Sequence, residues 1–140
     1  MDRVQTSAQN PVLLYDGVCA LCNGAVRWIL EQDQRGEFRF AALQSEYARG
    51  ELGTRGLDAD ALATVYLIAD GKLYSRSRAA IEIGRRLGGV WKFTAALAWL
   101  VPWFLRDWVY DWVARNRYQK FGKYDSCPVP PPEVRDRFLQ

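Results

Sequence analysis

The hydrophobic and polar positions along the chain change period at several points, and each change predicts an element. Val12 to Tyr15 is a short continuous apolar run ended by Asp16-Gly17, which is typical of a buried strand. From Ala20 onward apolar residues recur at helical spacing, and we end this helix near Gln34 because Gly36 follows. The start of the chain therefore predicts a strand, a tight turn and a helix.

The same reasoning predicts further elements as far as Leu87. Alternating apolar residues indicate strands, Asp70-Gly71 indicates a hairpin turn, and Gly88-Gly89 ends a helix. The predicted elements are a strand over Glu37 to Leu43, a helix over Gln44 to Leu52, a loop over Gly53 to Ala59, strands over Ala63 to Ala69 and Lys72 to Tyr74, and a helix to Leu87 capped by Ser75 or Ser77.

The order of these elements, β-α-β-α-β-β-α, is typical of a thioredoxin-like domain. We expect an α/β fold with a four-stranded mixed sheet flanked by helices and the Val12 to Tyr15 strand inside it. A length of 140 residues, 49% hydrophobic and 25% charged, fits one domain. Residues 1–10 are expected to be a flexible tail, and 11–140 a single domain with a helical extension (90–118) and a proline-rich tail (125–140).

The extension holds five of the six tryptophans. Ala95 to Leu105 is an apolar run of eleven residues that Pro102 divides, which predicts two helices, and the run is too short to span a bilayer. We expect both helices to cover the sheet and bury their aromatic residues. Peripheral contact with a membrane or a groove in a partner protein is the alternative, although Asp107 and Asp111 weigh against the membrane. After the prolines, Glu133 to Leu139 predicts one or two helical turns.

The candidate chemistry lies where the first strand meets the first helix, at Cys19 and Cys22. A helix N-terminus offers unpaired backbone N–H groups and a positive dipole, which both favour a thiolate. Cys22 begins the apolar face of the helix, whereas we expect Cys19 to face outward. This predicts Cys19 as the nucleophile of thiol-disulfide exchange and Cys22 as the resolving thiol.

Other interpretations of the pair stay open. It could be part of a zinc site, but such a site takes four ligands and the chain has three cysteines and no histidine. The two cysteines could also be inert, small hydrophobic side chains. We expect no metal and no cofactor. A non-catalytic thioredoxin-like module, which binds through its Trp-rich helices or senses redox state, is the alternative to an enzyme.

The charge and composition of the chain limit the classes of binding partner and substrate that we expect. The net charge of +3 and scattered basic residues do not indicate nucleic-acid binding. Met1 to Asn10 contains no apolar signal region, so we expect a cytoplasmic location, where a C-x-x-C pair is more often catalytic than structural. The expected substrate is a disulfide-containing protein or a low-molecular-weight thiol such as glutathione. The carboxylates of glutathione suit the basic cluster of Arg115, Arg117, Lys120 and Lys123, if that cluster is not simply a solvated face.

Two motifs give the chain a family resemblance. Asp16-Gly17-x-Cys19-x-x-Cys22 resembles the signature of the DCC family of thiol-disulfide oxidoreductases. The stretches Ala114 to Tyr118 and Phe121 to Lys123, with Asp125-x-Cys127 before the prolines, resemble the C-terminal pattern of that family. The resemblance covers about Val12 to Leu139 and implies a thioredoxin-like fold and thiol redox chemistry.

Asp16 and Cys127 complete the predicted site. A carboxylate beside Cys19 would disfavour its thiolate, so Asp16 must serve another purpose. It could hold the turn by accepting backbone N–H bonds, or act as the base that removes the proton of Cys22. Cys127 is a candidate auxiliary thiol if the tail folds back to the C-x-x-C pair.

Overall fold

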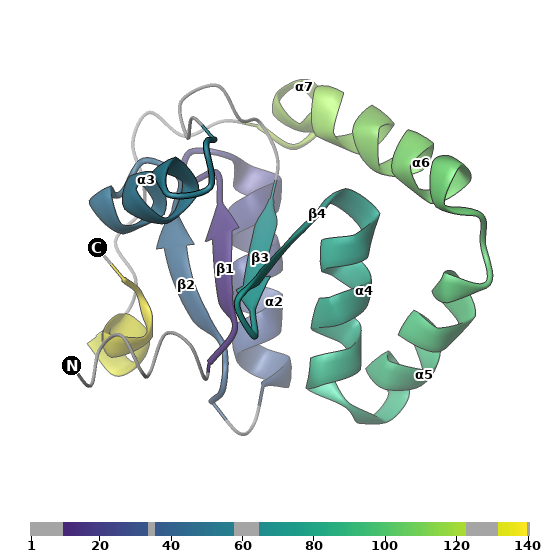
Figure 1. Ribbon diagram of the computed structural model, residues 1–140, viewed down its shortest axis with the longest axis horizontal. Coiled ribbons are helices and arrows are strands. Elements are labelled where there is room, and N and C mark those ends of the chain that lie inside the picture. Colours follow the sequence, from purple (N-terminus) through teal and green to yellow (C-terminus); the bar gives the residue numbers. More distant parts are fainter. Residues whose placement is uncertain (1–9, 34–35, 58–64, 123–131, 140) are drawn as a thin grey trace.

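The computed structural model describes residues 10–33, 36–57, 65–122 and 132–139, without the side chains of Arg76 and Arg117. Its centre is a four-stranded sheet in the order β2-β1-β3-β4 (Figure 1). The strands are β1 (Val12–Tyr15), β2 (Arg39–Ala42), β3 (Tyr66–Ala69) and β4 (Lys72–Ser75). β1 pairs in parallel with β2 and antiparallel with β3, which pairs antiparallel with β4. The predicted mixed sheet with the first strand inside it is confirmed.

Helices cover both faces of this sheet. On one face, Leu13 and Tyr15 pack in a core with residues of α2 (Ala20–Gln32) and α4 (Arg76–Leu87). On the other face, Val12 and Leu14 pack in a second core with residues of α3 (Glu46–Gly53). Alternate residues of β1 thus enter opposite cores, which explains why this strand is apolar throughout.

The observed bounds differ modestly from the predicted ones. β2 and β3 are shorter than expected, and α3 begins after Ser45, whose hydroxyl accepts the Ala48 N–H. Ser75 precedes α4 but its side chain makes no capping bond, and Ser77 instead donates to Asp107 Oδ1 at 2.5 Å. Ser75 is therefore the N-cap residue by position, as predicted, but its hydroxyl does not cap the helix, and the Ser77 hydroxyl attaches α6 (Trp103–Arg115) to α4. The expected tail 1–10 lies almost wholly outside the described residues.

The last described segment returns to the sheet. The predicted helical turns are present as a 3-10 helix, η2 (Pro132–Arg137), and Phe138 stacks on Phe40 with ring centroids 5.2 Å apart. The Leu139 N–H donates to the Phe40 carbonyl at 2.7 Å, and Arg137 Nη2 pairs with the buried Asp33 carboxylate at 2.5 Å. These contacts pin the C-terminal segment beside β2.

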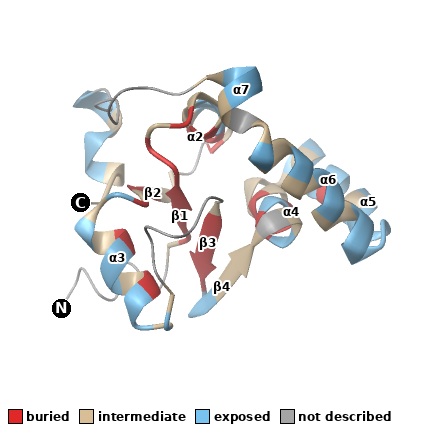
Figure 2. Ribbon diagram, turned by 90° about the horizontal axis from the view of Figure 1, so that it is seen from above, coloured by how far each residue is buried: buried red, intermediate tan, exposed pale blue. Residues whose placement is uncertain are grey.

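The aromatic extension does not cover the sheet. It forms α5 (Gly89–Trp99) and α6 (Trp103–Arg115), which lie outside α4 and are largely exposed (Figures 1 and 2). α5 packs on α4 through small residues: a Cβ placed on Gly84 would lie 3.1 Å from Ala95 Cβ. The expectation that the aromatic residues are buried is wrong: Ala95 is the buried residue of α5, and α6 buries none of its residues.

Polar and cation-π contacts fix the extension instead. The Trp91 indole N–H donates to Gln32 Oε1 at 3.0 Å, and the Trp91 ring meets Trp28 edge to face at 4.6 Å. The Trp99 ring lies 4.7 Å from the Arg78 guanidinium and 5.1 Å from that of Arg106. Among the described helices none is both long and apolar enough to cross a membrane.

Candidate active site

The cysteine pair lies at the predicted junction of strand and helix. Asp16 follows β1, and Cys19 is the N-cap residue of α2, with extended backbone (φ −83°, ψ 123°). The Cys19 sulfur accepts the backbone N–H of Cys22 at 3.3 Å, the bond that a serine or aspartate oxygen makes at an ordinary helix start. A sulfur in this position receives both an N–H donor and the positive end of the helix dipole, which favour its thiolate.

Both sulfurs are sheltered. Cys22 lies on the buried face of α2, as predicted, but Cys19 is also buried, with 0% of its surface exposed. The expectation that Cys19 faces outward is therefore wrong. Helical periodicity placed Cys19 away from the buried stripe of α2, but the residues that cover it come from elsewhere in the chain. Both cysteines are free thiols in this structure.

The environment of Cys22 raises the pKa of its thiol. The hydrogen bond between the two cysteine side chains raises the pKa of the Cys22 thiol far above its usual range, and burial and the charge of Cys19 raise it further. Asp16 also raises it through its charge, while a bond to the Asp16 backbone acts in the opposite direction. The structure therefore makes the two sulfurs unequal, with Cys22 as the protonated partner.

Asp16 is buried and its carboxylate accepts three hydrogen bonds. The Val18 N–H donates to Oδ1 at 3.2 Å and the Gln44 amide donates to Oδ1 at 3.0 Å, while the Tyr118 hydroxyl donates to Oδ2. The Gln44 side chain also accepts the Gly17 N–H at 3.1 Å. The carboxylate thus connects the Asp-Gly turn to β2 and to a helix far along the chain.

That distant helix is α7 (Arg117–Phe121), and it lies against the start of α2. Besides the Tyr118 bond to Asp16, the Gly122 carbonyl accepts the Ala20 N–H at 3.2 Å, which satisfies one of the free donors of the α2 start. The two sequence motifs therefore meet in space, although Asp16 and Tyr118 are 102 positions apart. Tyr118 of α7 also packs against the core that contains both cysteines.

The structure brings together Asp16, Cys19 and Cys22, whereas Cys127 lies outside the described residues. Sequence reasoning missed Gln44 and gave no role to Tyr118 or Gly122. Tyr118 and Gly122 could have been found from the sequence, since both belong to the C-terminal pattern of the family. Gln44 could not, because a single glutamine between a strand and a helix matches no motif. Within the described ranges no group of three or more histidine, cysteine or acidic residues is arranged to hold a metal ion.

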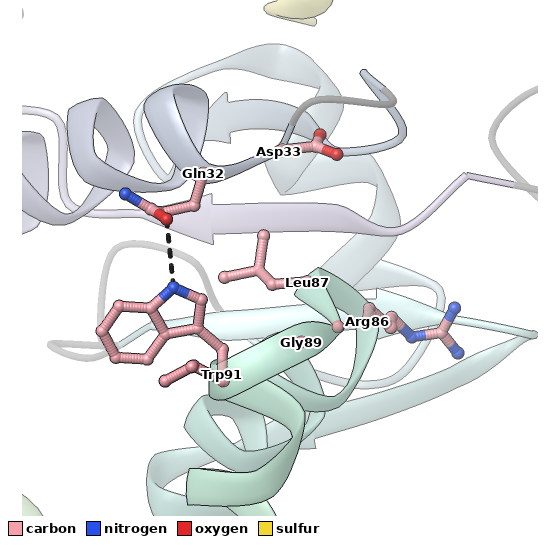
Figure 3. A pocket seen from close by; sticks show the side chains of 8 residues that line it. Gln32, Asp33, Arg86, Leu87, Gly89 and Trp91 are labelled. Carbon is pink, nitrogen blue, oxygen red and sulfur yellow. Dashed lines mark hydrogen bonds between the residues drawn. The ribbon is translucent and has the colours of Figure 1, made fainter.

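A surface pocket at the other end of α2 is separate from this site. Gln32 and Asp33 line it together with residues of the α4–α5 junction, among them Arg86, Leu87 and Trp91 (Figure 3). Along α2, Cys19 lies about 20 Å and Cys22 about 15 Å from Gln32, at 1.5 Å per residue. The pocket therefore takes no part in the chemistry of the cysteine pair.

A four-stranded mixed sheet with a C-x-x-C pair at the start of α2 is consistent with a thioredoxin-like fold and is typical of thiol-disulfide oxidoreductases. The model of the DCC1-like thiol-disulfide oxidoreductase family matches residues 13–123, and the chain belongs to this family.

Two relatives extend the comparison. The chain is 45% identical to the uncharacterised protein YuxK of Bacillus subtilis (strain 168) over 136 residues, 96% of this chain and 98% of YuxK. It is 37% identical to a chloroplastic DCC family protein of Arabidopsis thaliana over 121 residues, 86% of this chain and 70% of that protein. No solved structure matches the chain.

Proposed function

We propose that this protein exchanges disulfides with a protein or small-thiol substrate, with Cys19 as the nucleophile and Cys22 as the resolving thiol. The observation that carries the proposal is the bond from the Cys22 N–H to the Cys19 sulfur at the helix start. It stabilises the charged form of one sulfur, while the side-chain bond between the cysteines keeps the proton on the other. Membership of the family supports the same chemistry.

The reaction balances in two steps. The Cys19 thiolate attacks one sulfur of the substrate disulfide, forms a mixed disulfide and releases the other sulfur as a thiolate. Cys22 then loses its proton and attacks the Cys19 sulfur, which releases the second substrate thiolate and leaves a Cys19–Cys22 disulfide. Two molecules of a cellular thiol, or one dithiol, then reduce the Cys19–Cys22 disulfide and leave as a disulfide themselves, which restores the starting state. Because Cys19 is fully buried, the first step also requires the cover over the start of α2 to open.

The burial of Cys19 favours a second candidate, a redox-sensing module in which the same disulfide forms without turnover. A sheltered pair reacts slowly with bulky substrates, but it can still be oxidised and change the packing of α7. Steady-state turnover separates the two functions, because a sensor transfers electrons once and a catalyst repeatedly.

The experiment measures reduction of a small aromatic disulfide with excess reducing thiol, followed by the absorbance of the released thiol. It uses a Cys127→Ser background, in which Cys19 and Cys22 are the two remaining thiols. We expect many turnovers per protein, none after Cys19→Ser, and a stable mixed disulfide on Cys19 after Cys22→Ser, seen as added mass in intact-protein mass spectrometry. Equal and mild effects of the two substitutions would contradict the assigned roles.

The background substitution is informative by itself. Unchanged turnover in Cys127→Ser means that Cys127 is not required, whereas a slower reaction that a free thiol restores would support the auxiliary role that the sequence predicts. A single turnover that ends with an intact Cys19–Cys22 disulfide would favour the sensing module.

A further inference from the structure

The connection between α5 and α6 is the most exposed apolar part of the described chain. Residues 99–105, which we call the apolar turn, contain no polar side chain and read Trp-Leu-Val-Pro-Trp-Phe-Leu. Leu100 is 78% exposed, Trp103 68% and Phe104 62%. Large apolar side chains that are exposed side by side in this way mark a surface that contacts something else.

The apolar turn lies at the edge of the molecule. α4 separates it from the sheet, and α5 and α6 run away from it on either side (Figures 1 and 2). Arg78 and Arg106 hold the ring of Trp99 at its base, so the turn is attached to the domain at a fixed point. A projecting tip of this kind suits insertion into a soft apolar layer better than it suits lining a groove.

The part of the chain that contains the apolar turn is basic. Residues 76–121 contain nine arginines and lysines and three acids, whereas the whole chain has a net charge of only +3. Of the acids, Glu82 is buried, and Asp107 and Asp111 are half-buried. The charged side chains described as exposed in this part are all basic: Arg78, Arg85, Lys92, Arg115 and Lys120. The two aspartates that weighed against a membrane thus do not dominate the surface.

We propose that the apolar turn inserts into the headgroup region of an anionic phospholipid membrane, with nearby basic side chains such as Arg78, whose guanidinium lies beside Trp99, in contact with the lipid phosphates. An apolar tip flanked by tryptophans and cations is the pattern of interfacial binding, in which tryptophan lies at the headgroup level and basic residues follow the negative surface potential. The eleven apolar residues from Ala95 to Leu105 are too few to span the bilayer, so the contact is peripheral.

The test measures sedimentation of the full-length protein with vesicles of phosphatidylcholine alone or of phosphatidylcholine mixed with phosphatidylglycerol. We expect binding to the anionic vesicles, weakened by added salt, and little binding to the neutral ones. Leu100→Ser should weaken binding roughly tenfold, since burying one leucine side chain changes an equilibrium constant by about that factor.

Val90→Ser is the matched control. Val90 is 72% exposed, much like Leu100, but it lies at the opposite end of α5, about 15 Å away at 1.5 Å per residue. Neither substitution changes the charge, and neither side chain is buried, so both variants should unfold at the wild-type urea concentration. We expect Val90→Ser to bind like wild type.

Three outcomes would overturn the proposal. One is that the wild-type protein does not bind anionic vesicles, and another is that the two substitutions weaken binding equally. The third is that the protein dimerises without vesicles and that Leu100→Ser abolishes the dimer, which would assign the apolar turn to a second copy of the chain. Because vesicle binding needs neither sulfur, Cys19→Ser should bind normally, so failure here is distinguishable from failure of the redox function.

Discussion

Replacing Tyr118 by phenylalanine removes the hydroxyl that joins α7 to the Asp16-Gly17 turn. That hydroxyl donates to the buried carboxylate of Asp16. A hydrogen bond to a charged group contributes about 1.5–3 kcal/mol to stability, so we expect the free energy of unfolding to fall by about 2 kcal/mol. With a denaturant slope of about 2 kcal/mol per molar urea, the midpoint falls by about 1 M.

Tyr110→Phe supplies the matched control, because the same atom is removed from a neutral contact. The Tyr110 hydroxyl on α6 accepts the backbone N–H of Val65 at 3.2 Å. A neutral hydrogen bond contributes about 1 kcal/mol, so its loss should lower the midpoint by about 0.5 M. Urea unfolding followed by tryptophan fluorescence measures both variants, with the slope expected to stay constant.

The partner of Tyr118 is tested by a double-mutant cycle with Asp16→Asn. If the hydroxyl and the carboxylate interact directly, the two losses are not additive, and the coupling energy should be about 1 kcal/mol. Because α7 lies over the start of α2, Tyr118→Phe should also speed alkylation of Cys19 by a maleimide, whereas Tyr110→Phe should not. A Tyr118→Phe cost no larger than that of Tyr110→Phe, or additive losses in the cycle, would refute the proposed anchoring of α7 on Asp16.

Three more perturbations test the site and the fold. In the mixed disulfide the resolution rate should rise about tenfold per pH unit through neutral and mildly alkaline pH, because burial and the charge of Asp16 still raise the pKa of Cys22 and leave little thiolate there. A quenched-flow pH profile that is flat would contradict this. Asp16→Asn should slow resolution and accumulate mixed disulfide if Asp16 is the base, and change only urea stability if it holds the turn. Phe138→Ala should cost about 2–3 kcal/mol of unfolding free energy, as it removes the ring stacked on Phe40; a urea midpoint within error of wild type would mean that the C-terminal segment is not pinned.

The turn-holding role is the better supported of the two for Asp16. Three donors reach its carboxylate, from Val18, Gln44 and Tyr118, and such donors stabilise the ion rather than the protonated acid that a base must become. Asparagine retains an oxygen for the Val18 and Gln44 bonds, and the Tyr118 hydroxyl can rotate to accept from its amide. Asp16→Asn therefore removes the base with little change in geometry.

The sequence predicts well those elements whose structure is determined by their own residues and not by contacts with distant segments. The strand Val12–Tyr15 and the start of α2 were confirmed because a fully buried strand is apolar throughout and the Asp16-Gly17 turn separates it from helical spacing. Cys22 was placed correctly on the buried face for the same reason. Local periodicity decided each of these positions.

The errors concern contacts between distant segments. The helical periodicity predicts the side of α2 on which Cys19 lies. The burial of Cys19, however, also depends on segments such as α7, about a hundred residues away in the chain. In α5 Trp91, Ala95 and Trp99 share one face of the helix, and nothing local says which of them packs closely on α4. The close approach at Gly84 and Ala95 decided this, because a glycine lets two helices meet at a distance that aromatic side chains would prevent.

The contacts of the cysteine pair also order the two steps of exchange. In the free protein the largest cause of the raised pKa of Cys22 is its bond to the Cys19 side chain, so Cys22 stays protonated while Cys19 attacks. Once Cys19 is bound in a mixed disulfide it carries no charge, so that bond weakens and the charge repulsion disappears. Burial, the second largest cause, and the Asp16 carboxylate still raise the pKa of Cys22, but the largest single cause is weakened. The first bond formed thus removes the main obstacle to the second, and Cys22 becomes a nucleophile only when there is a mixed disulfide to resolve.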